Sequence, residues 1–388
     1  MVYHSAQFKE AIYEQVARVV EDFRKTNSIT ILDLSVGDPD LPLDKNLEEL
    51  LVKHIRSGAY TRYPPQYGHG SLKDAVVRWY VRKFGVQLTA KNVCILMGSK
   101  EGIAHLSLLI NHQSEHVLVP DPAYPIYEKA ARMAMATPYI MPLKQENGFL
   151  PDLSAIPEEI LKNTKLMYLN YPNNPTGAVM TDSFFNESMT LARQHGFLIC
   201  FDKAYEELEI TPNKRYSVFN YPNGERHAVE LYSFSKSHNC TAFRIGFAVG
   251  GEETIKMLND IKAVYDSGHY VPIQLLAADA LERDEIIASN NAVYRRRNEI
   301  VQSGLKEMGI RFMPRTSTFY FWCEVPGKFS DLSSFEFCMK LFRETGVMLT
   351  PGSGFGKYGE GYFRLSLTEK DEILEEAMGR MREWIRRK

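Results

Sequence analysis

The sequence VELYSFSKSHNCTAFRIGFAVG, residues 229–250, decides the fold that we expect for the whole chain. Its first six residues form a short apolar run that is typical of a buried β-strand, and residues 243–250 predict a second strand. The segment between the two runs is polar and contains Lys236. Ligands of open α/β sheets bind beyond the carboxyl ends of strands, so a lysine directly after a strand is a candidate site residue.

Four similar apolar runs lie upstream, at residues 92–97, 116–120, 165–170 and 197–202. Between them the apolar residues take the spacing of amphipathic helices, as in EGIAHLSLLI and IYEKAARMA. Strands that alternate with helices predict an α/β fold whose large, mostly parallel sheet is sandwiched by helices.

The C-terminal part of the chain has a different pattern, which begins after about residue 280. A long charged helix leads into strand-like runs such as TFYFWCEV and YFRLSLT, which predict a smaller α+β lobe. The first 40 or so residues hold one amphipathic helix and the strand-like ITILDLSVG, and we expect them to pack with this lobe. We therefore predict a large domain over residues 45–280 and a small domain over residues 1–44 and 281–388.

The composition argues against several classes of protein. The 388 residues carry a net charge of −2, so the general basic field of a nucleic-acid-binding protein is absent. No window approaches the ~18 apolar residues of a membrane span, and the first residues, MVYHSAQFKEAIYEQV, do not form a secretory signal. The five cysteines are scattered without a CxxC pair, which predicts no metal site and favours a reducing, cytoplasmic compartment.

The residues around Lys236 are those that pyridoxal 5′-phosphate (PLP) chemistry requires. A lysine amine can form a Schiff base with PLP and afterwards carry protons. The hydroxyls of Ser233 and Ser235 precede Lys236, and Arg244 offers a planar fork that pairs with phosphate oxygens. For this segment alone, a solvated lysine beside a surface arginine is an equally open interpretation.

A second candidate group follows the apolar run that ends in FLICFD. Asp202 ends this run, where a carboxylate needs a partner, and the pyridine nitrogen of PLP is such a partner. Tyr205, three residues later, can donate to the phenolic oxygen of the ring. Asp202 can equally be the cap of a following helix.

Two segments after strands extend this pattern. In Asn-Asn-Pro-Thr-Gly, Asn174 can hydrogen-bond to the same phenolic oxygen, although the segment is also an ordinary turn. Ser99 and Lys100 stand between a strand and a helix, where free helix amides, a hydroxyl and a cation can bind a phosphate. Ser99 as a plain helix N-cap is the alternative.

Two further residues are candidates for ring stacking and for substrate binding. Tyr124, in DPAYP, can stack on a flat ring, and a core or rim aromatic is the alternative interpretation. Arg364 lies within the apolar run YFRLSL, where a charge requires a partner. That partner is either the carboxylate of a substrate or a structural acid.

Together these motifs resemble the class I aminotransferases of PLP fold type I over nearly the whole chain. The segments that carry the likeness are VGDPD (36–40), YPPQYG (63–68), GSKEG (98–102), DPAYP (121–125), YPNNPTG (171–177), FDKAY (201–205), SFSK with FRIG, TPGSGFG (350–356) and YFRLSLT. As a set they are far more specific than any one of them.

The resemblance implies a role for each candidate residue. Lys236 is the Schiff-base lysine, Asp202 pairs with the ring nitrogen, and Tyr205 and Asn174 bind the phenolic oxygen. The phosphate-binding positions are Ser99, Lys100, Ser233, Ser235 and Arg244. Tyr124 matches the stacking aromatic, Arg364 the carboxylate-binding arginine, and Gly37 a glycine whose backbone lies against the substrate. Tyr63 matches a tyrosine lent to the neighbouring subunit, which implies a homodimer with shared sites.

Within this family the chain is most similar to the LL-diaminopimelate aminotransferase and aspartate aminotransferase-like branch. This likeness implies a ping-pong transfer of an amino group from an L-amino acid to a 2-oxo acid such as 2-oxoglutarate. Two segments depart from that branch: SKSHNCTAFRIG stands where SKTYNMTGWRIG is expected, and AVYDSGHY differs from the usual SNIDSG. The departures leave the donor open and leave His238 and His269 without an assigned role.

Other functions remain to be weighed. A PLP-dependent lyase, cyclase or oxidase of an amino acid fits the altered residues after Lys236, and a regulatory protein that binds PLP without turnover is a candidate of another class. A serine enzyme with a Ser233–Lys236 pair would place this motif at a helix start and would need SDN and KTG segments, which the chain lacks. No GxGxxG motif supports a dinucleotide site.

Overall fold

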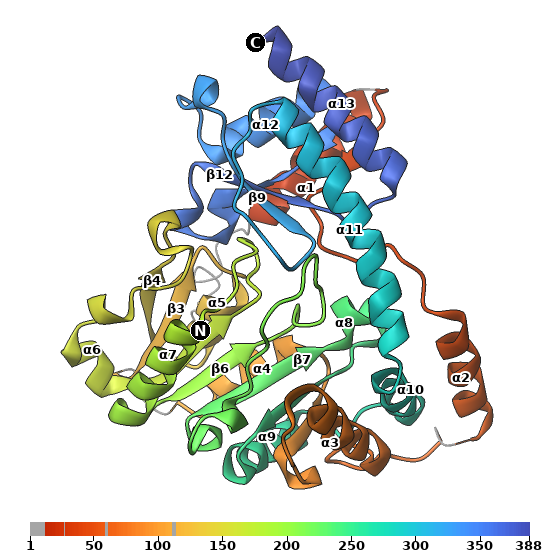
Figure 1. Cartoon of the computed structure of the whole chain (residues 1–388), viewed down its shortest axis with the longest axis vertical. Helices are drawn as coiled ribbons and strands as arrows, with labels where there is room; N and C mark the ends of the chain where they lie inside the picture. Colours follow the sequence, from red (N-terminus) through yellow and green to blue (C-terminus); the bar gives the residue numbers. More distant parts are fainter. Residues whose placement is uncertain (1–11, 27, 59–60, 111–113) are drawn as a thin grey trace, which may run out of the picture.

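The computed structural model describes residues 12–26, 28–58, 61–110 and 114–388. Its largest element is a seven-stranded sheet with the strand order β2-β8-β7-β6-β5-β3-β4 (Figure 1). The strands are β2 (Val93–Leu96), β3 (His116–Asp121), β4 (Thr137–Pro142), β5 (Thr164–Asn170), β6 (Leu198–Asp202), β7 (Ala228–Ser233) and β8 (Gly246–Gly250). The sheet and its covering helices confirm the predicted α/β fold.

Strands β4, β3, β5, β6 and β7 run parallel to one another. Strand β8 is antiparallel to both of its neighbours, β7 and β2, so the sheet is mostly parallel, as predicted. Strand β4 was not expected, because Pro138 and Pro142 interrupt its apolar pattern. It lies at the edge of the sheet, where prolines are tolerated because one side needs no hydrogen-bond partners.

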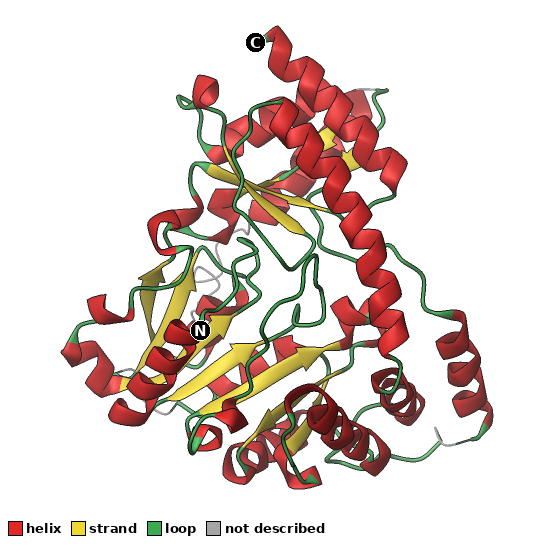
Figure 2. Ribbon diagram, viewed as in Figure 1, coloured by secondary structure: helices red, strands yellow, loops and turns green. Residues whose placement is uncertain are grey.

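Helices cover both faces of this sheet (Figure 2). One face packs against α4 (Ser99–Ser107), α5 (Ile126–Met133) and α9 (Glu252–Tyr265). The other face packs against α3 (Gly70–Phe84), α7 (Asp182–His195) and α10 (Val271–Leu281). Alternate residues of one strand therefore enter different cores: Val229 and Leu231 of β7 face α4 and α9, whereas Tyr232 faces α3.

The C-terminal part is built on a three-stranded antiparallel sheet in the order β11-β12-β9. Its elements are α11 (Asp284–Glu307), β9 (Tyr320–Glu324), α12 (Ser334–Thr345), β10 (Val347–Met348), β11 (Thr350–Pro351), β12 (Tyr362–Ser366) and α13 (Asp371–Arg387). The predicted strands in TFYFWCEV and YFRLSLT are β9 and β12, which pair directly, and Arg364 of β12 lies opposite Trp322 of β9.

The N-terminal segment lies against this C-terminal part. It contains α1 (Ile12–Thr26) and β1 (Leu32–Asp33), and β1 pairs in parallel with β10. Phe23 of α1 packs on Phe342 of α12, with ring centroids 4.5 Å apart. The expected strand over ITILDLSVG is much shorter in the structure, because the backbone of Ser35 and Val36 bonds to side chains.

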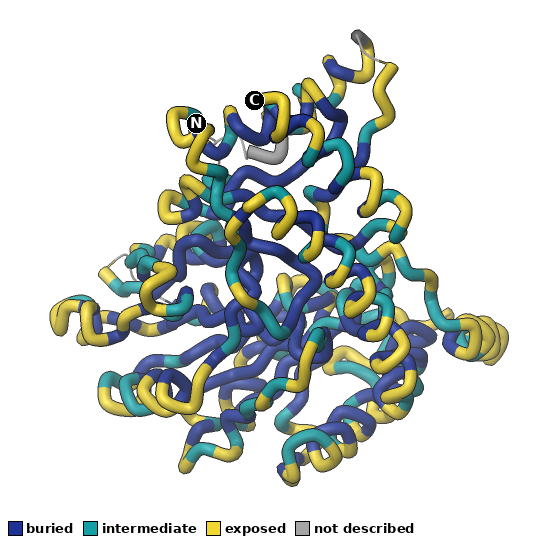
Figure 3. The backbone as a smooth tube through the Cα atoms, turned by 45° about the horizontal axis from the view of Figure 1, so that its top comes forward, coloured by how far each residue is buried: buried dark blue, intermediate teal, exposed yellow. Residues whose placement is uncertain are grey.

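The domain boundaries after residues 44 and 280 remain a prediction, and residues 1–11, 27, 59–60 and 111–113 of the two predicted domains lie outside the described residues. Helix α2 (Lys45–Arg56) follows the first predicted boundary, and Leu47 is its one fully buried residue. The rest of this helix is mostly exposed (Figure 3). The two remaining helices are short: α6 (Glu158–Asn163) and α8 (Phe234–Ser237).

No helix within the described ranges is long and apolar enough to cross a membrane. The described part of the chain also contains no group of three or more His, Cys, Asp or Glu residues arranged to hold a metal ion. All five cysteines are free and buried: Cys94, Cys200, Cys240, Cys323 and Cys338.

Candidate active site

A hollow of about 600 Å³ opens where β5, β6 and β7 end, facing the C-terminal part of the chain. We call it the central hollow. Every predicted site residue except Tyr63 lines it: Gly37, Ser99, Lys100, Tyr124, Asn174, Asp202, Tyr205, Ser233, Ser235, Lys236, Arg244 and Arg364. The structure thus brings together residues that are more than 300 positions apart in the chain.

Lys236 lies in the one-turn helix α8, which is capped by Ser233. We expected a polar loop here, so this local prediction was wrong. The Ser233–Lys236 pair does lie at a helix start, as a serine enzyme would require, so the local structure does not argue against that interpretation. The missing SDN and KTG segments still do. The Nζ of Lys236 donates to the carbonyl oxygen of Gly37 over 2.6 Å, and burial lowers its pKa to about 8 although Asp38 acts in the opposite direction. A buried amine with a lowered pKa is suited to nucleophilic and proton-transfer chemistry.

Asp202 ends β6 and is buried at the floor of the central hollow. Its Oδ2 accepts a hydrogen bond of 2.7 Å from Tyr127, and its Oδ1 accepts one of 3.3 Å from the amide of Ala204. Burial raises the pKa of Asp202 to about 6, although hydrogen bonds from Tyr127, Ala204 and Ser99 act in the opposite direction. A turn rather than a helix follows, so Asp202 is not a helix cap. An acid held this way, with no cation paired to it among the described residues, is suited to a protonated ring nitrogen.

Arg364 is buried, and its hydrogen-bond partners are neutral. Its Nη1 donates to the Oδ1 of Asn174 over 2.8 Å, and its Nη2 donates to the carbonyl oxygen of Ser35 over 2.6 Å. Its Nε is buried without a hydrogen-bond partner in the described part of the chain. The interpretation of a structural acid as partner is therefore wrong for the described residues. A buried guanidinium without a counter-charge is a binding position for a carboxylate.

The other end of the central hollow is built around the start of α4. Gly98 rather than Ser99 is the N-cap of α4, which corrects the alternative that Ser99 is a plain cap. Arg244 reaches this end, where its Nη1 lies 3.4 Å from the Oγ of Ser235 and its Nη2 donates to the carbonyl oxygen of Met97 over 3.1 Å. A Cβ on Gly98, whose φ is +85°, would lie 3.0 Å from Nη2 of Arg244. Free helix amides, hydroxyls and a guanidinium together are suited to a phosphate.

Tyr124 and Lys100 form the rim of the hollow. The Nζ of Lys100 lies 5.6 Å from the centroid of the Tyr124 ring, and the edge of Tyr124 meets Tyr127 at an interplanar angle of 90°. Tyr124 is partly exposed, so its ring is available to a flat ligand.

Tyr63 does not line the hollow; it is 87% exposed. The two histidines without an assigned role are also absent from the lining of the hollow. His238 is buried and bonds to Ser237 and to the carbonyl oxygen of Ala280, and burial lowers its pKa to about 4. His269 accepts from the amide of Tyr270. Both therefore have local structural contacts.

The structure adds residues that sequence reasoning missed. Tyr127 donates a hydrogen bond to Asp202, and its place three residues after Tyr124, at the start of the predicted helix, was the signal that could have found it. Asn170 ends β5, donates to the carbonyl oxygen of Asp202 and accepts from the amide of Asn174. Tyr320, whose hydroxyl lies 3.1 Å from that of Tyr205, had no signal, since it is one aromatic in an apolar run.

Residues 35–37 line the hollow beside α8 and are held by contacts on both sides. The carbonyl oxygen of Val36 accepts from Thr368 over 2.7 Å, and Asp40 forms a two-pronged ion pair with Arg297 at 2.6 and 2.8 Å. Gly37 lies between these anchors, and a Cβ at this position would be 1.8 Å from the hydroxyl oxygen of Tyr320. Only glycine fits here without displacing the tyrosine.

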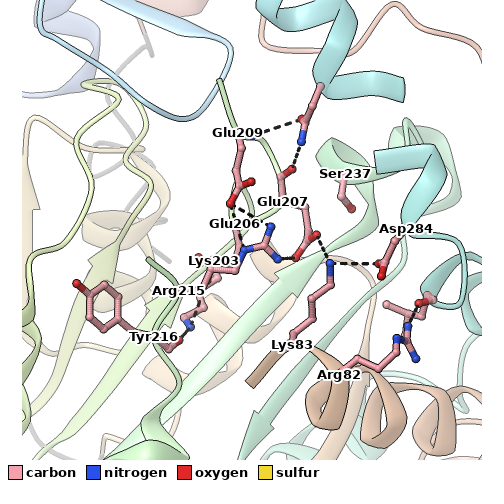
Figure 4. A network of polar contacts seen from close by, with 12 residues as sticks. Arg82, Lys83, Lys203, Glu206, Glu207, Glu209, Arg215, Tyr216, Ser237 and Asp284 are labelled. Carbon is pink, nitrogen blue, oxygen red and sulfur yellow. Dashed lines mark hydrogen bonds and ion pairs between the residues drawn. The ribbon is translucent and has the colours of Figure 1, made fainter. Parts of the chain in front are cut away.

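A network of ion pairs connects the turn that follows β6 to β7 and α3 (Figure 4). Lys203 pairs with Glu230 of β7 at 2.7 Å, and both side chains are buried. Glu207 pairs with Arg215, and also with Lys83 of α3 at 3.2 Å. Because Asp202 lies just before this turn and Tyr205 lies within it, this network helps to hold their positions.

The residues of the hollow fit PLP. The buried, unpaired carboxylate of Asp202 suits the ring nitrogen, and the cradle of Gly98, Ser235 and Arg244 suits the phosphate. Lys236 supplies an amine in the same hollow. The guanidinium of Arg364 is left over for an acidic substrate.

Comparisons with known proteins agree with this geometry. The family profile "Aminotransferase class I and II" matches residues 29–381. The chain is 40% identical to LL-diaminopimelate aminotransferase from Aquifex aeolicus over 356 residues, which cover 91% of each protein. Substrate-bound BacF from Bacillus subtilis superposes with a TM-score of 0.91 at 32% identity and covers 99% of this chain and 98% of that one. A probable N-succinyldiaminopimelate aminotransferase from Thermus thermophilus gives a TM-score of 0.88 at 33% identity, over 96% of this chain and 100% of that one.

These matches confirm the resemblance that the motifs indicated. They span nearly the full length of the chain, and two of the named relatives are called aminotransferases. The chain belongs to the class I and II aminotransferase family and is a PLP-dependent aminotransferase.

Proposed function

We propose that the amino donor is LL-diaminopimelate or a closely related aspartate-like amino acid, and that 2-oxoglutarate is the acceptor, in a ping-pong exchange. The relative from Aquifex aeolicus, at 40% identity, is named for this donor, and a relative from Syntrophobacter fumaroxidans with the same name is 38% identical. The observation that carries the proposal is the meeting of Lys236, Asp202 and Arg364 in one hollow. It supports a reaction at the Cα of a molecule with a carboxylate.

In this proposal each residue has one task at the cofactor. Lys236 carries PLP, Asp202 holds its ring nitrogen protonated, and Tyr205 and Asn174 donate to its phenolic oxygen. Tyr124 stacks on the ring, and the phosphate is held by Ser99, Lys100, Ser233, Ser235 and Arg244. When bound, PLP supplies a carbonyl carbon that takes up amino groups and a ring that takes up the electron pair released at the substrate Cα.

Substrate handling falls to the residues of the C-terminal part and of the N-terminal segment. Arg364 pairs with the α-carboxylate through charge-assisted hydrogen bonds, and the backbone of Gly37 lies against the substrate. Once its amine is released, Lys236 takes the proton from Cα and returns it to the cofactor side, which requires hydrogen-bond reach to both carbons. The lowered pKa of Lys236 supports this role, because near pH 8 the amine both takes up and gives up protons.

The donor is tested by adding single amino acids to the PLP-loaded protein and following the loss of its visible absorption band. We expect LL-diaminopimelate to bleach the band faster than aspartate or an unbranched apolar amino acid does. Addition of 2-oxoglutarate should then restore the band, which a lyase, cyclase or oxidase would not show. If no tested diacid or diamine donor bleaches the band faster than alanine, the proposed donor is wrong.

We also propose a homodimer whose two sites each use Tyr63 of the other chain. Large exposed side chains gather on two loops that touch each other, since Gly268 lies against Pro64 and Pro65. The large exposed side chains on these loops and in the last turn of α9 are Tyr63, Tyr67, Val264, Tyr265 and Tyr270. Exposed apolar patches of this kind support a protein interface.

Shared sites can be tested by mixing two inactive variants. Tyr63→Ala chains lack the lent tyrosine and Lys236→Ala chains lack the amine, so neither homodimer has an intact site. After mixing and subunit exchange, mixed dimers should regain one tight PLP site each, seen as a visible band at low PLP concentration. A mixture that behaves as the sum of its parts contradicts the sharing of Tyr63.

The remaining proposals concern the cell and the domains. We propose a cytoplasmic enzyme, which the five unpaired thiols support, because such thiols persist in a reducing compartment. We propose that residues 45–280 form a PLP-binding domain and that residues 1–44 and 281–388 form the small domain. The pairing of β1 with β10 supports the joining of the two distant segments.

A further inference from the structure

Tyr320 contacts both the cofactor tyrosine, Tyr205, and the substrate arginine, Arg364, of the proposed site. It is buried at the start of β9. Its hydroxyl lies 3.1 Å from that of Tyr205, and the Cζ of Arg364 lies 4.1 Å from the centroid of its ring. Its hydroxyl therefore contacts a proposed cofactor residue, and its ring contacts a proposed substrate residue.

The ring of Tyr320 supports Arg364. Tyr320 and Arg364 lie on the same face of the three-stranded sheet, because Arg364 pairs with Trp322 and Ser366 pairs with Tyr320. The guanidinium rests on the π-face of Tyr320, and Phe355 lies 4.8 Å from its Cζ. Such stacking fixes a cation that has no counter-charge, and it leaves the guanidinium edge free for a carboxylate.

The proposed role of Tyr205 fixes the direction of the hydrogen bond between the hydroxyls of Tyr205 and Tyr320. Between two tyrosine hydroxyls, either oxygen can be the donor. If Tyr205 gives its proton to the phenolic oxygen of PLP, as we propose above, it can only accept from Tyr320. When the hydroxyl of Tyr205 accepts a hydrogen bond from Tyr320, its own O–H group becomes more polarised. Tyr320 then strengthens the hydrogen bond that Tyr205 donates to the phenolic oxygen of PLP.

The backbone before Tyr320 is held in an uncommon conformation. Thr318 has φ +66°, in the left-handed region that β-branched residues rarely adopt. Its amide donates to the carbonyl oxygen of Leu208 over 3.1 Å, and its carbonyl oxygen accepts from Arg315 over 2.8 Å. Its side chain accepts from the amide of Tyr320 over 3.2 Å. Three hydrogen bonds thus fix the entry of β9 and with it the place of Tyr320.

We propose that Tyr320 is a positioning residue with two separable tasks: its ring orients Arg364 toward the substrate carboxylate, and its hydroxyl directs the proton of Tyr205 toward the cofactor. The inference rests on the roles of Tyr205 and Arg364 in the proposed function. It adds a physical link between the cofactor side and the substrate side of the hollow, since a single side chain serves both.

The two tasks are separated by two substitutions in the PLP-loaded protein. Tyr320→Phe keeps the ring, so KM for the amino donor should stay within about twofold. The pH midpoint of the visible band should rise by roughly 0.3–1 unit, because the phenolic oxygen loses hydrogen-bond support. Tyr320→Leu also removes the ring, and KM should rise about 5- to 30-fold. Tyr362→Phe is the matched control, because that hydroxyl bonds to Gln145 away from the hollow and its loss should change neither quantity.

A double substitution tests whether the hydroxyl acts through Tyr205. Tyr205→Phe should raise the pH midpoint by itself, and adding Tyr320→Phe should then raise it no further. A midpoint that moves in Tyr205→Phe but not in Tyr320→Phe overturns the inference and leaves the proposed function intact. An equal effect of Tyr320→Phe in both backgrounds also overturns it. If Tyr205→Phe leaves the midpoint in place, the role of Tyr205 in the proposed function fails.

Discussion

The Nζ of Lys236 lies 2.6 Å from the carbonyl oxygen of Gly37, which stands 199 positions earlier in the chain. This contact joins α8, at the end of the large sheet, to the N-terminal segment that lies against the C-terminal part. It also gives the amine a neutral acceptor rather than a carboxylate, so burial controls its protonation.

The reaction of cofactor-free protein with PLP should therefore depend on pH with a midpoint near 8, the lowered pKa of Lys236, because only the neutral amine attacks an aldehyde. The rate of appearance of the visible band, measured by stopped flow from pH 6 to 10, should level off above this midpoint. Lys236→Ala should show no such phase. A rate that still climbs steeply at pH 10 would mean that the amine behaves as an ordinary lysine.

Replacement of Arg364 by Ala should weaken binding of the amino donor. The lost charge-assisted pair is worth about 1.5–3 kcal/mol, which corresponds to a roughly 10- to 150-fold higher KM. Arg311→Ala is a control of the same size, because the Arg311 side chain is 82% exposed on the C-terminal part and should leave KM unchanged. An equal KM in the two variants would remove Arg364 from substrate binding.

Lys203→Met should destabilise the fold strongly. It leaves the fully buried carboxylate of Glu230 without its cation, and breaking a buried pair in this way costs about 3–5 kcal/mol. The exposed pair of Lys256 with Asp260 is the comparison, since Lys256→Met should cost only about 0–1 kcal/mol. Urea unfolding midpoints of the two variants decide between these expectations, and similar midpoints would contradict the first.

Glu206 should make the protein less stable as the pH rises. Burial raises its pKa to about 7, so between its ordinary value of 4.5 and about 7 the folded state binds more protons than the unfolded state. This contribution to stability is complete below pH 4.5 and is lost as the pH passes 7. Glu206→Gln should flatten this slope in thermal unfolding between pH 5 and 8. An identical slope in the variant and the unmodified protein would assign the effect to another group.

The large sheet could be predicted because its strands are buried on both faces and read as continuous apolar runs. The N-terminal strand was predicted too long, since the carbonyl oxygens of Ser35 and Val36 bond to the side chains of Thr350 and Thr368 instead of to a neighbouring strand. Such bonds to distant side chains have no periodic signal in the sequence.

The candidate site was predictable where polar residues follow strand ends, as at Asp202 and Ser233. Tyr320 was not, because its role arises from contacts with Tyr205 and Arg364 across different elements. For Tyr63 the sequence motif could be recognised, but its proposed role is at the site of a second chain, so a single chain does not bring it to a site.

Each of the five thiols is packed inside a core, and burial raises the pKa of both Cys94 and Cys240 to about 12. A sulfhydryl reagent in solution therefore reaches them only when the surrounding core opens, so the labelling rate measures how often it opens. Cys200 would report on the large sheet, and Cys338 on the core between α12 and α13. The labelling rates of these two native cysteines therefore measure how often each of the two cores opens, and no cysteine has to be introduced.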